Sequence, residues 1–120
     1  MIDGLPNLER VRIGDNSFQQ STSADFSNVF SISNCPKLME LIIGNNCFVS
    51  YTLFDISNLH SMVNVSIVSN SLVSVNTVLA NGLEKLSEMK IGEESLKSIQ
   101  KYNHFLVVNN IDLKSMIYQY

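Results

Sequence analysis

A repeated spacing of apolar residues limits what this 120-residue chain can fold into more than any other feature of its sequence. Four segments share the same intervals, and only Glu94 departs from an otherwise constant asparagine position. The shared positions are Leu5, Leu8, Val11, Ile13, Asn16 and Phe18; Cys35, Leu38, Leu41, Ile43, Asn46 and Phe48; Leu59, Met62, Val65, Ile67, Asn70 and Leu72; and Leu83, Leu86, Met89, Ile91, Glu94 and Leu96. The sequence therefore predicts one domain, residues 1–120, built by stacking repeated units.

The length of the repeat is read from one column of this alignment. Steps of 30, 24, 24 and 27 residues separate Leu8, Leu38, Met62, Leu86 and Leu113. The basic period is thus 24, and the insertions fall outside the regular segments, where loops absorb them. A fifth, incomplete unit is expected to place Leu113, Met116 and Tyr118 on its inward positions, which gives about four and a half repeats.

Each segment contains a short stretch in which apolar and mostly polar residues alternate. Val11 and Ile13 in the first segment, like Leu41 and Ile43 in the second, are separated by one residue, as in a strand with one buried face. Strands that recur once per repeat must run parallel, because the chain returns each time from the same side. The pattern predicts a parallel sheet with one strand from each repeat.

These intervals resemble the leucine-rich repeat family, whose pattern is L-x-x-L-x-L-x-x-N/C-x-L. The match lies in Leu8 to Phe18, Leu38 to Phe48, Met62 to Leu72 and Leu86 to Leu96, and a second apolar column contains Phe30, Phe54, Val78 and Phe105. The resemblance covers nearly the whole chain. It implies an α/β fold, a solenoid with a curved parallel sheet on its concave face and short helices, turns and irregular segments on its convex face.

The asparagine column has two interpretations. In the family such residues form a buried ladder that holds adjacent repeats together, which would give Asn16, Asn46 and Asn70 a structural role. The alternative is that they are turn asparagines, which tolerate unusual backbone dihedrals. We expect the ladder.

The segments that follow each asparagine column are rich in Ser, Thr and Asn and predict turns or short irregular pieces, with residues 96–102 as the best helix candidate. Gly14, Gly44 and Gly92 recur just after the predicted strands, and we expect them to serve turns.

The candidate binding site follows from the strand alternation. Residues between the inward positions should face outward on the concave sheet, the surface on which the family usually binds partners. They are Arg10, Arg12, Glu40, Ile42, Asn64, Ser66, Glu88 and Lys90, with Ser115 and Ile117 in the fifth unit. The alternative is that they are solvated side chains that make weak cross-strand pairs, such as Arg10 with Glu40.

Composition disfavours other classes of partner. A net charge of −3 without a basic run disfavours nucleic acid, and the sequence contains neither a membrane-length apolar stretch nor a signal peptide. His60 and His104 lack metal-ligand or triad spacing, and Cys35 and Cys47 are not expected to form a disulfide. We expect no cofactor, no metal, no catalysis and a cytoplasmic location, with an extracellular one open if the chain is part of a longer protein.

The leading functional hypothesis is a module that binds a protein partner, of unknown identity, through its concave face. Neither end resembles a capping repeat, so we expect a fragment of a longer array; the alternative is that self-association or a partner subunit closes the open ends. The alternative function is therefore a structural subunit that stacks through those ends.

Overall fold

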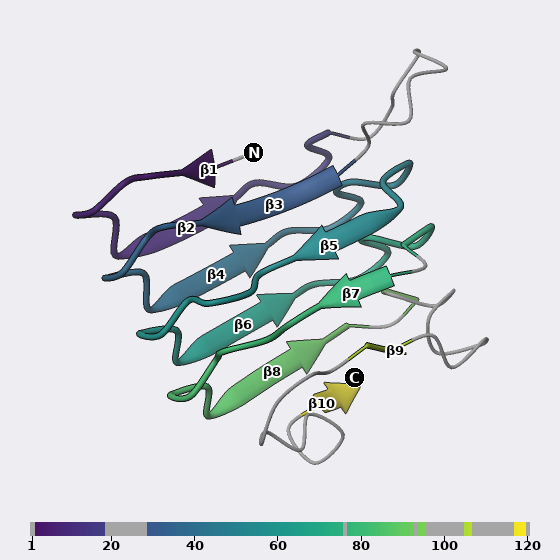
Figure 1. The fold of residues 1–120 in the computed structure, drawn as a ribbon. Helices are drawn as coiled ribbons and strands as arrows, with labels where there is room; N and C mark the ends of the chain where they lie inside the picture. Colours follow the sequence, from purple (N-terminus) through teal and green to yellow (C-terminus); the bar gives the residue numbers. More distant parts are fainter. Residues whose placement is uncertain are drawn as a thin grey trace.

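The described residues form two parallel β-sheets, each with five strands, and the chain alternates between the two sheets along the sequence (Figure 1). This is a computed structural model that describes residues 2–18, 29–75, 77–92 and 94–95 in full and the backbone of residues 105–106 and 117–119. One sheet has the order β10-β8-β6-β4-β2, formed by β2 (Arg10–Ile13), β4 (Glu40–Ile43), β6 (Asn64–Ile67), β8 (Glu88–Ile91) and β10 (Ile117–Gln119). The other has the order β1-β3-β5-β7-β9, formed by β1 (Ile2–Asp3), β3 (Val29–Ser33), β5 (Leu53–Asp55), β7 (Thr77–Leu79) and β9 (Phe105–Leu106).

The first sheet has the strands and the register that the alternating pattern predicts. Val11 lies beside Leu41, Leu41 beside Val65, and Val65 beside Met89, so the column of the sequence alignment is a column in space. The inward residues of β4, β6 and β8 are buried, while the alternate residues are exposed or half-buried. The prediction of a parallel sheet with one strand per repeat is confirmed.

The fifth strand shows that the predicted register of the last unit is wrong by one residue. Ile117 pairs with Met89 and Gln119 pairs with Ile91, whereas the sequence prediction gave those places to Met116 and Tyr118. The stretch around Met116, Ile117 and Tyr118 is apolar at both parities, so alternation could not separate the two registers.

The second sheet corrects the prediction for the return segments. These were expected to form helices, turns and irregular pieces, yet β3, β5 and β7 are strands, and the described residues contain no helix. The second apolar column is nevertheless confirmed, because Phe30 pairs with Phe54, Phe54 with Val78, and Val78 with Phe105. The helix candidate at residues 96–102 lies outside the described residues.

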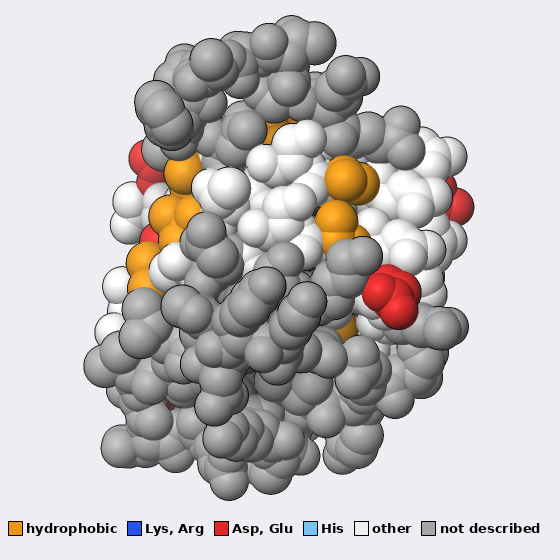
Figure 2. Space-filling view, turned by 90° about the vertical axis from the view of Figure 1, so that its right-hand side faces the viewer, with side chains coloured by type: hydrophobic (Ala, Val, Ile, Leu, Met, Phe, Trp, Pro, Cys, Tyr) orange, Lys and Arg blue, Asp and Glu red, His pale blue; other side chains and the backbone are white. Residues whose placement is uncertain are grey.

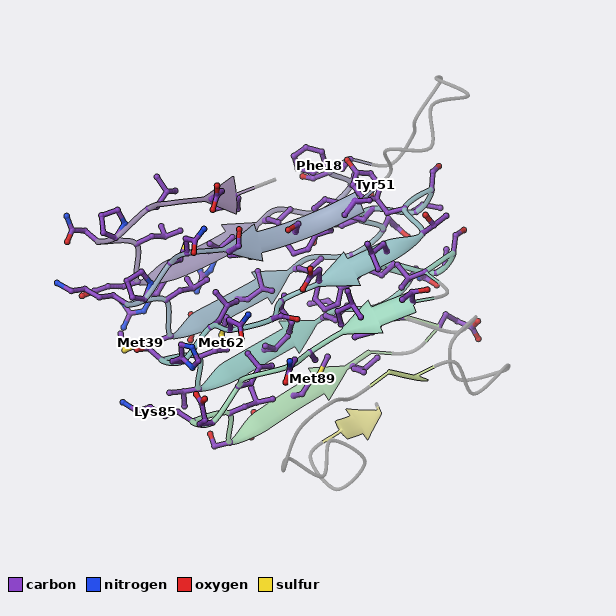
Figure 3. The ribbon with its side chains drawn as sticks, viewed as in Figure 1. Phe18, Met39, Tyr51, Met62, Lys85 and Met89 are labelled. Atoms are coloured by element: carbon purple, nitrogen blue, oxygen red, sulfur yellow. The ribbon has the colours of Figure 1, made fainter. Side chains whose placement is uncertain are left out.

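The core fills the space between the two sheets. Leu38, Leu41, Phe54 and Leu59 have no exposed surface, and neighbouring aromatic rings pack on one another, with Phe30 and Phe54 stacked at 5.2 Å. Figure 3 shows Met62 and Met89 between the sheets. Each repeat thus buries its apolar side chains against the next repeat as well as across the core.

Turns with left-handed backbone close each repeat. At one edge, Gly4, Asn34, Asn58 and Gly82 occupy equivalent positions with φ of +69°, +53°, +61° and +74°. Glycine and asparagine adopt this conformation most readily, which accounts for the residue types found there. Phe18, Phe48 and Leu72 also have φ near +55°, a conformation that costs a bulky residue free energy. Phe48 and Leu72 are held there by burial.

Gly44 and Gly92 serve close approach between repeats rather than an unusual dihedral. A Cβ on Gly92 would lie 2.7 Å from the carbonyl carbon of Val68, and one on Gly44 would lie 2.9 Å from the backbone nitrogen of Asp15. Neither residue has a positive φ. A Cβ on Gly14, in the same column, would meet no neighbouring atom within 4 Å. The predicted turn role is therefore corrected, since backbone proximity selects glycine at two of the three positions.

Candidate functional site

The outward residues of β2, β4, β6 and β8 form two continuous rows across the first sheet. One row contains Arg10, Glu40, Asn64 and Glu88, and the other contains Arg12, Ile42, Ser66 and Lys90. We call these eight residues the strand face. They are the eight residues that the sequence marks as the candidate binding site, and none of them is buried.

The register of the sheet holds the strand face in place. Parallel strands lie about 4.8 Å apart, so side chains in one row recur at that interval along a stiff backbone. Arg10, Arg12 and Lys90 are exposed, whereas Glu40, Ile42, Asn64, Ser66 and Glu88 are half-buried. Of the two outward residues predicted in the fifth unit, Ser115 lies outside the described residues, as does Met116. Ile117 does not take the predicted place beside Lys90, because Tyr118 pairs with Lys90.

The charges of the strand face are mostly unpaired. Lys90 Nζ lies 3.3 Å from Glu88 Oε1 on the same strand, and both side chains are substantially exposed. The pair between Arg10 and Glu40 that the alternative interpretation names is not found among the described residues, although the two lie directly beside each other in the sheet. Arg10 and Arg12 thus present two cations without an acidic partner in the described part of the chain.

Asn64 lies at the middle of the strand face with an incompletely satisfied amide. Its Oδ1 is buried and has no hydrogen-bond partner among the described residues. Its neighbours in the row, Glu40 and Glu88, offer acceptors rather than donors. An unsatisfied buried acceptor costs about 1–3 kcal/mol, so a donor that reached this amide would lower the free energy of the site.

The predicted buried asparagine ladder is not what the structure shows. Asn16 and Asn70 are exposed and Asn46 is half-buried, and all three have φ between +56° and +62°. Asn46 Nδ2 donates to Asn16 Oδ1 over 3.2 Å in an exposed contact. The alternative of turn asparagines describes these residues better, because their main feature is the left-handed backbone.

A column of small residues, half-buried at Ser17 and buried at Cys47, Ser71 and Ser95, links the repeats instead. Ser71 Oγ donates to Gly44 O over 2.5 Å and accepts from Cys47 N over 3.0 Å, so one hydroxyl joins two repeats twice. Cys47 Sγ donates to Gly14 O over 3.1 Å, and Ser95 Oγ accepts from Ser71 N over 3.0 Å. The signal in the sequence was a recurring small polar residue directly after the asparagine column.

The remaining candidates are structural. His60, an exposed turn residue, lies with its Nδ1 2.6 Å from Glu84 Oε2 in the next repeat. This hydrogen bond lowers the pKa of Glu84. Cys35 and Cys47 are both buried free thiols, and His104 lies outside the described residues.

Other classes of site find no counterpart in the described part of the chain. It contains no group of three His, Cys, Asp or Glu side chains placed to hold a metal ion. None of its elements is a helix with the length and hydropathy needed to cross a membrane. On the side of the molecule shown in Figure 2, the charged side chains in view among the described residues are carboxylates, and no lysine or arginine is in view.

Comparison of the chain with protein-family models, with curated proteins and with solved structures found no match.

Proposed function

We propose that this chain is a leucine-rich repeat solenoid that binds another protein through the strand face. The observation that carries the proposal is the pair of continuous rows, eight side chains in register across four strands. Such an array offers charged, polar and apolar groups at fixed spacing, which is what a protein surface needs to recognise a partner without first ordering a loop.

The solenoid assignment rests on the sequence columns and on the two sheets together. Every repeat from the second to the fourth contributes one strand to each sheet, and a period of 24 residues recurs in the pairing of β4 with β6 and of β6 with β8. The family pattern gives the same order of positions. The protein would differ from helix-bearing relatives in having a second sheet on its convex side.

The chemistry of the strand face supports a protein partner. Arg10 and Arg12 offer bidentate donors, Ile42 offers apolar surface, and Asn64 has an acceptor without a partner. A partner that presents carboxylates to the arginines would complete these groups. Protein interfaces combine a polar rim with a more apolar centre, and arginine is enriched in them.

The test uses two hydroxyl residues with matched burial on opposite sheets. Ser66→Arg places a long side chain at the middle of the strand face, and Thr77→Arg places the same side chain on β7, in the other sheet. A protein that is captured by the native chain is then purified, and its affinity for all three chains is measured by calorimetry. We expect at least a tenfold loss with Ser66→Arg alone.

Circular dichroism and thermal unfolding of both variants establish whether the fold is retained. Equal affinity of all three folded chains for the purified partner would refute binding through the strand face.

A further inference from the structure

Among the described residues, none covers the sheet edge at β2, and the columns that are buried in later repeats are more exposed there. Leu8 and Ile13 are half-buried, whereas Leu38 and Ile43 have no exposed surface. Phe18 is 58% exposed, whereas Phe48, its counterpart one repeat later, is 3% exposed. On the side of β2 away from β4, the described residues place no strand.

An apolar hollow of about 340 Å³ opens at this edge. Its walls come from both sheets and from the turn between them, and Figure 3 shows Phe18 and Tyr51 close together at its rim. The lining residues are Ile2, Ile13, Phe18, Phe30, Phe48 and Tyr51, with Val29 and Ser31. The ring of Phe18 stacks on that of Phe48 at 4.8 Å, which leaves the other face of the Phe18 ring open.

The backbone of β2 has hydrogen-bonding groups to offer along the same edge. In a parallel sheet each interior strand forms hydrogen bonds on both of its sides, whereas β2, in the described part of the chain, pairs only on the side toward β4. Such an edge is a template for an added strand unless its side chains prevent pairing.

Arg10 and Arg12 determine which strand can pair there. Two copies of β2 related by a two-fold axis would run antiparallel. A register centred on Val11 places Arg10 opposite Arg12, and one centred on Arg12 places that residue opposite itself. Like charges directly opposite one another destabilise a sheet. A register shifted by one residue would not avoid these like-charge pairs at acceptable cost, because it would turn Val11 and Ile13 toward solvent.

The strand on the other side of β2 shows the chemistry that fits. In β4, Glu40 lies beside Arg10, while Leu41 and Ile43 lie beside Val11 and Ile13. A strand with acidic residues at outward positions and apolar residues at inward positions therefore complements β2 on charge and on burial.

We propose that the β2 edge and the adjoining hollow form a second binding site, which accepts an extended segment of a partner protein that alternates acidic and apolar residues, and which disfavours two-fold pairing of the chain with itself. The segment would extend the first sheet as a parallel strand, place carboxylates beside Arg10 and Arg12, and put an aromatic or large aliphatic residue on Phe18. This site shares Arg10 and Arg12 with the strand face, but its ligand lies at the edge of the sheet rather than across its outward rows.

The probe is a peptide that copies the known neighbour of β2. It comprises residues 36–48 with Ile42→Glu and Cys47→Ser, so that a carboxylate can face each arginine and Phe48 can reach Phe18. A second peptide carries Glu40→Lys and Ile42→Lys with the same serine. Binding of both labelled peptides to the full chain is measured by fluorescence anisotropy, and the mass of the chain alone is followed by light scattering over a dilution series.

We expect the native chain to bind the acidic peptide at least tenfold more tightly than the basic one. The Arg10→Glu/Arg12→Glu variant should exchange this preference, because both arginines are exposed and their reversal leaves the core intact. Phe18→Ser should weaken both peptides, whereas Lys85→Glu, an exposed cation on a distant turn (Figure 3), should change neither. Circular dichroism checks the fold of each variant.

Three outcomes would overturn the proposal: no saturable binding of the acidic peptide, a preference that the charge reversal does not exchange, or a native chain that dimerises on its own. Variants of the strand face that leave β2 unchanged, such as Ser66→Arg, should not affect the peptides. Failure of this site and failure of the proposed function are therefore distinguishable.

Discussion

The hydroxyl of Ser71 illustrates how single side chains hold neighbouring repeats at a fixed distance. It is fully buried, donates to the backbone of the preceding repeat and accepts from that same repeat. A buried backbone N–H or C=O without a partner is costly, and this side chain satisfies one of each. The column of Ser17, Cys47, Ser71 and Ser95 therefore takes the connecting role that the sequence suggested for the asparagines.

We expect Ser71→Ala to reduce the free energy of unfolding by about 1–3 kcal/mol, because Cys47 N and Gly44 O would both lose a partner in the core. Urea unfolding followed by circular dichroism measures the change. Ser87→Ala is the matched control, since the Ser87 hydroxyl also donates to a backbone carbonyl, that of Val63, but at an exposed position. Equal losses in the two variants would show that the buried column has no special importance.

At the scale of elements, the turns between strands interact across repeats as the strands do. The turn that contains His60 lies beside the turn that contains Glu84, and their side chains form a hydrogen bond. This bond is the largest cause of the lowered pKa of Glu84, which falls below its ordinary value of 4.5. A lowered carboxyl pKa contributes stability above the unfolded-state value, and that contribution is lost as the pH falls through the folded-state value.

The His60→Ala variant should therefore raise the pKa of Glu84 toward 4.5 and make unfolding depend less on pH below that value. A carbon-detected NMR titration of the Glu84 carboxyl follows the first effect, and unfolding at several pH values follows the second. Asp3 is an internal reference, because the pKa of its carboxyl is lowered by Asn34 and Ser33 instead. A Glu84 pKa that does not move would assign its shift to another cause.

The strands of the first sheet were predictable because their information is local. Alternation fixes the buried face of each strand, and the common spacing fixes the register between Val11, Leu41 and Val65. The second sheet was missed because its strands, such as Leu53–Asp55, form by pairing with the equivalent segment of the neighbouring repeat. Serine and asparagine around them favour turns when each segment is considered alone.

The sequence predicted which residues form the candidate site, but not which of their polar groups have hydrogen-bond partners. Alternation alone places Arg12, Asn64 and Lys90 on one face, whereas the missing partner of Asn64 Oδ1 depends on the side chains of two other strands. The sequence could not predict the exposure of Phe18 either. Phe18 and Phe48 occupy the same position of the sequence pattern and differ only in the neighbours that pack on them. The spacing of residues cannot report which of two equivalent positions has a neighbour on both sides.

At the scale of the whole molecule, stability should depend on position along the stack of repeats. Each repeat contacts the repeats before and after it, so a residue between two repeats has neighbours on both sides, while one at the β2 edge has neighbours on one side. Ile13 and Ile67 form a matched pair for this idea. They share a residue type and a column, but Ile13 is half-buried and Ile67 has no exposed surface.

Ile67→Ala should reduce the free energy of unfolding by about 2–5 kcal/mol, because it leaves a cavity between repeats that cannot collapse. Ile13→Ala should cost about half as much, since water already reaches that side chain and fewer contacts are lost. Urea unfolding of the two variants under identical conditions measures both values. If the acidic peptide occupies the β2 edge, saturating peptide should increase the cost of Ile13→Ala toward that of Ile67→Ala, because the added strand would bury the first isoleucine as the following repeats bury the second. Equal costs without peptide would show instead that the edge repeat is already as well packed as the interior.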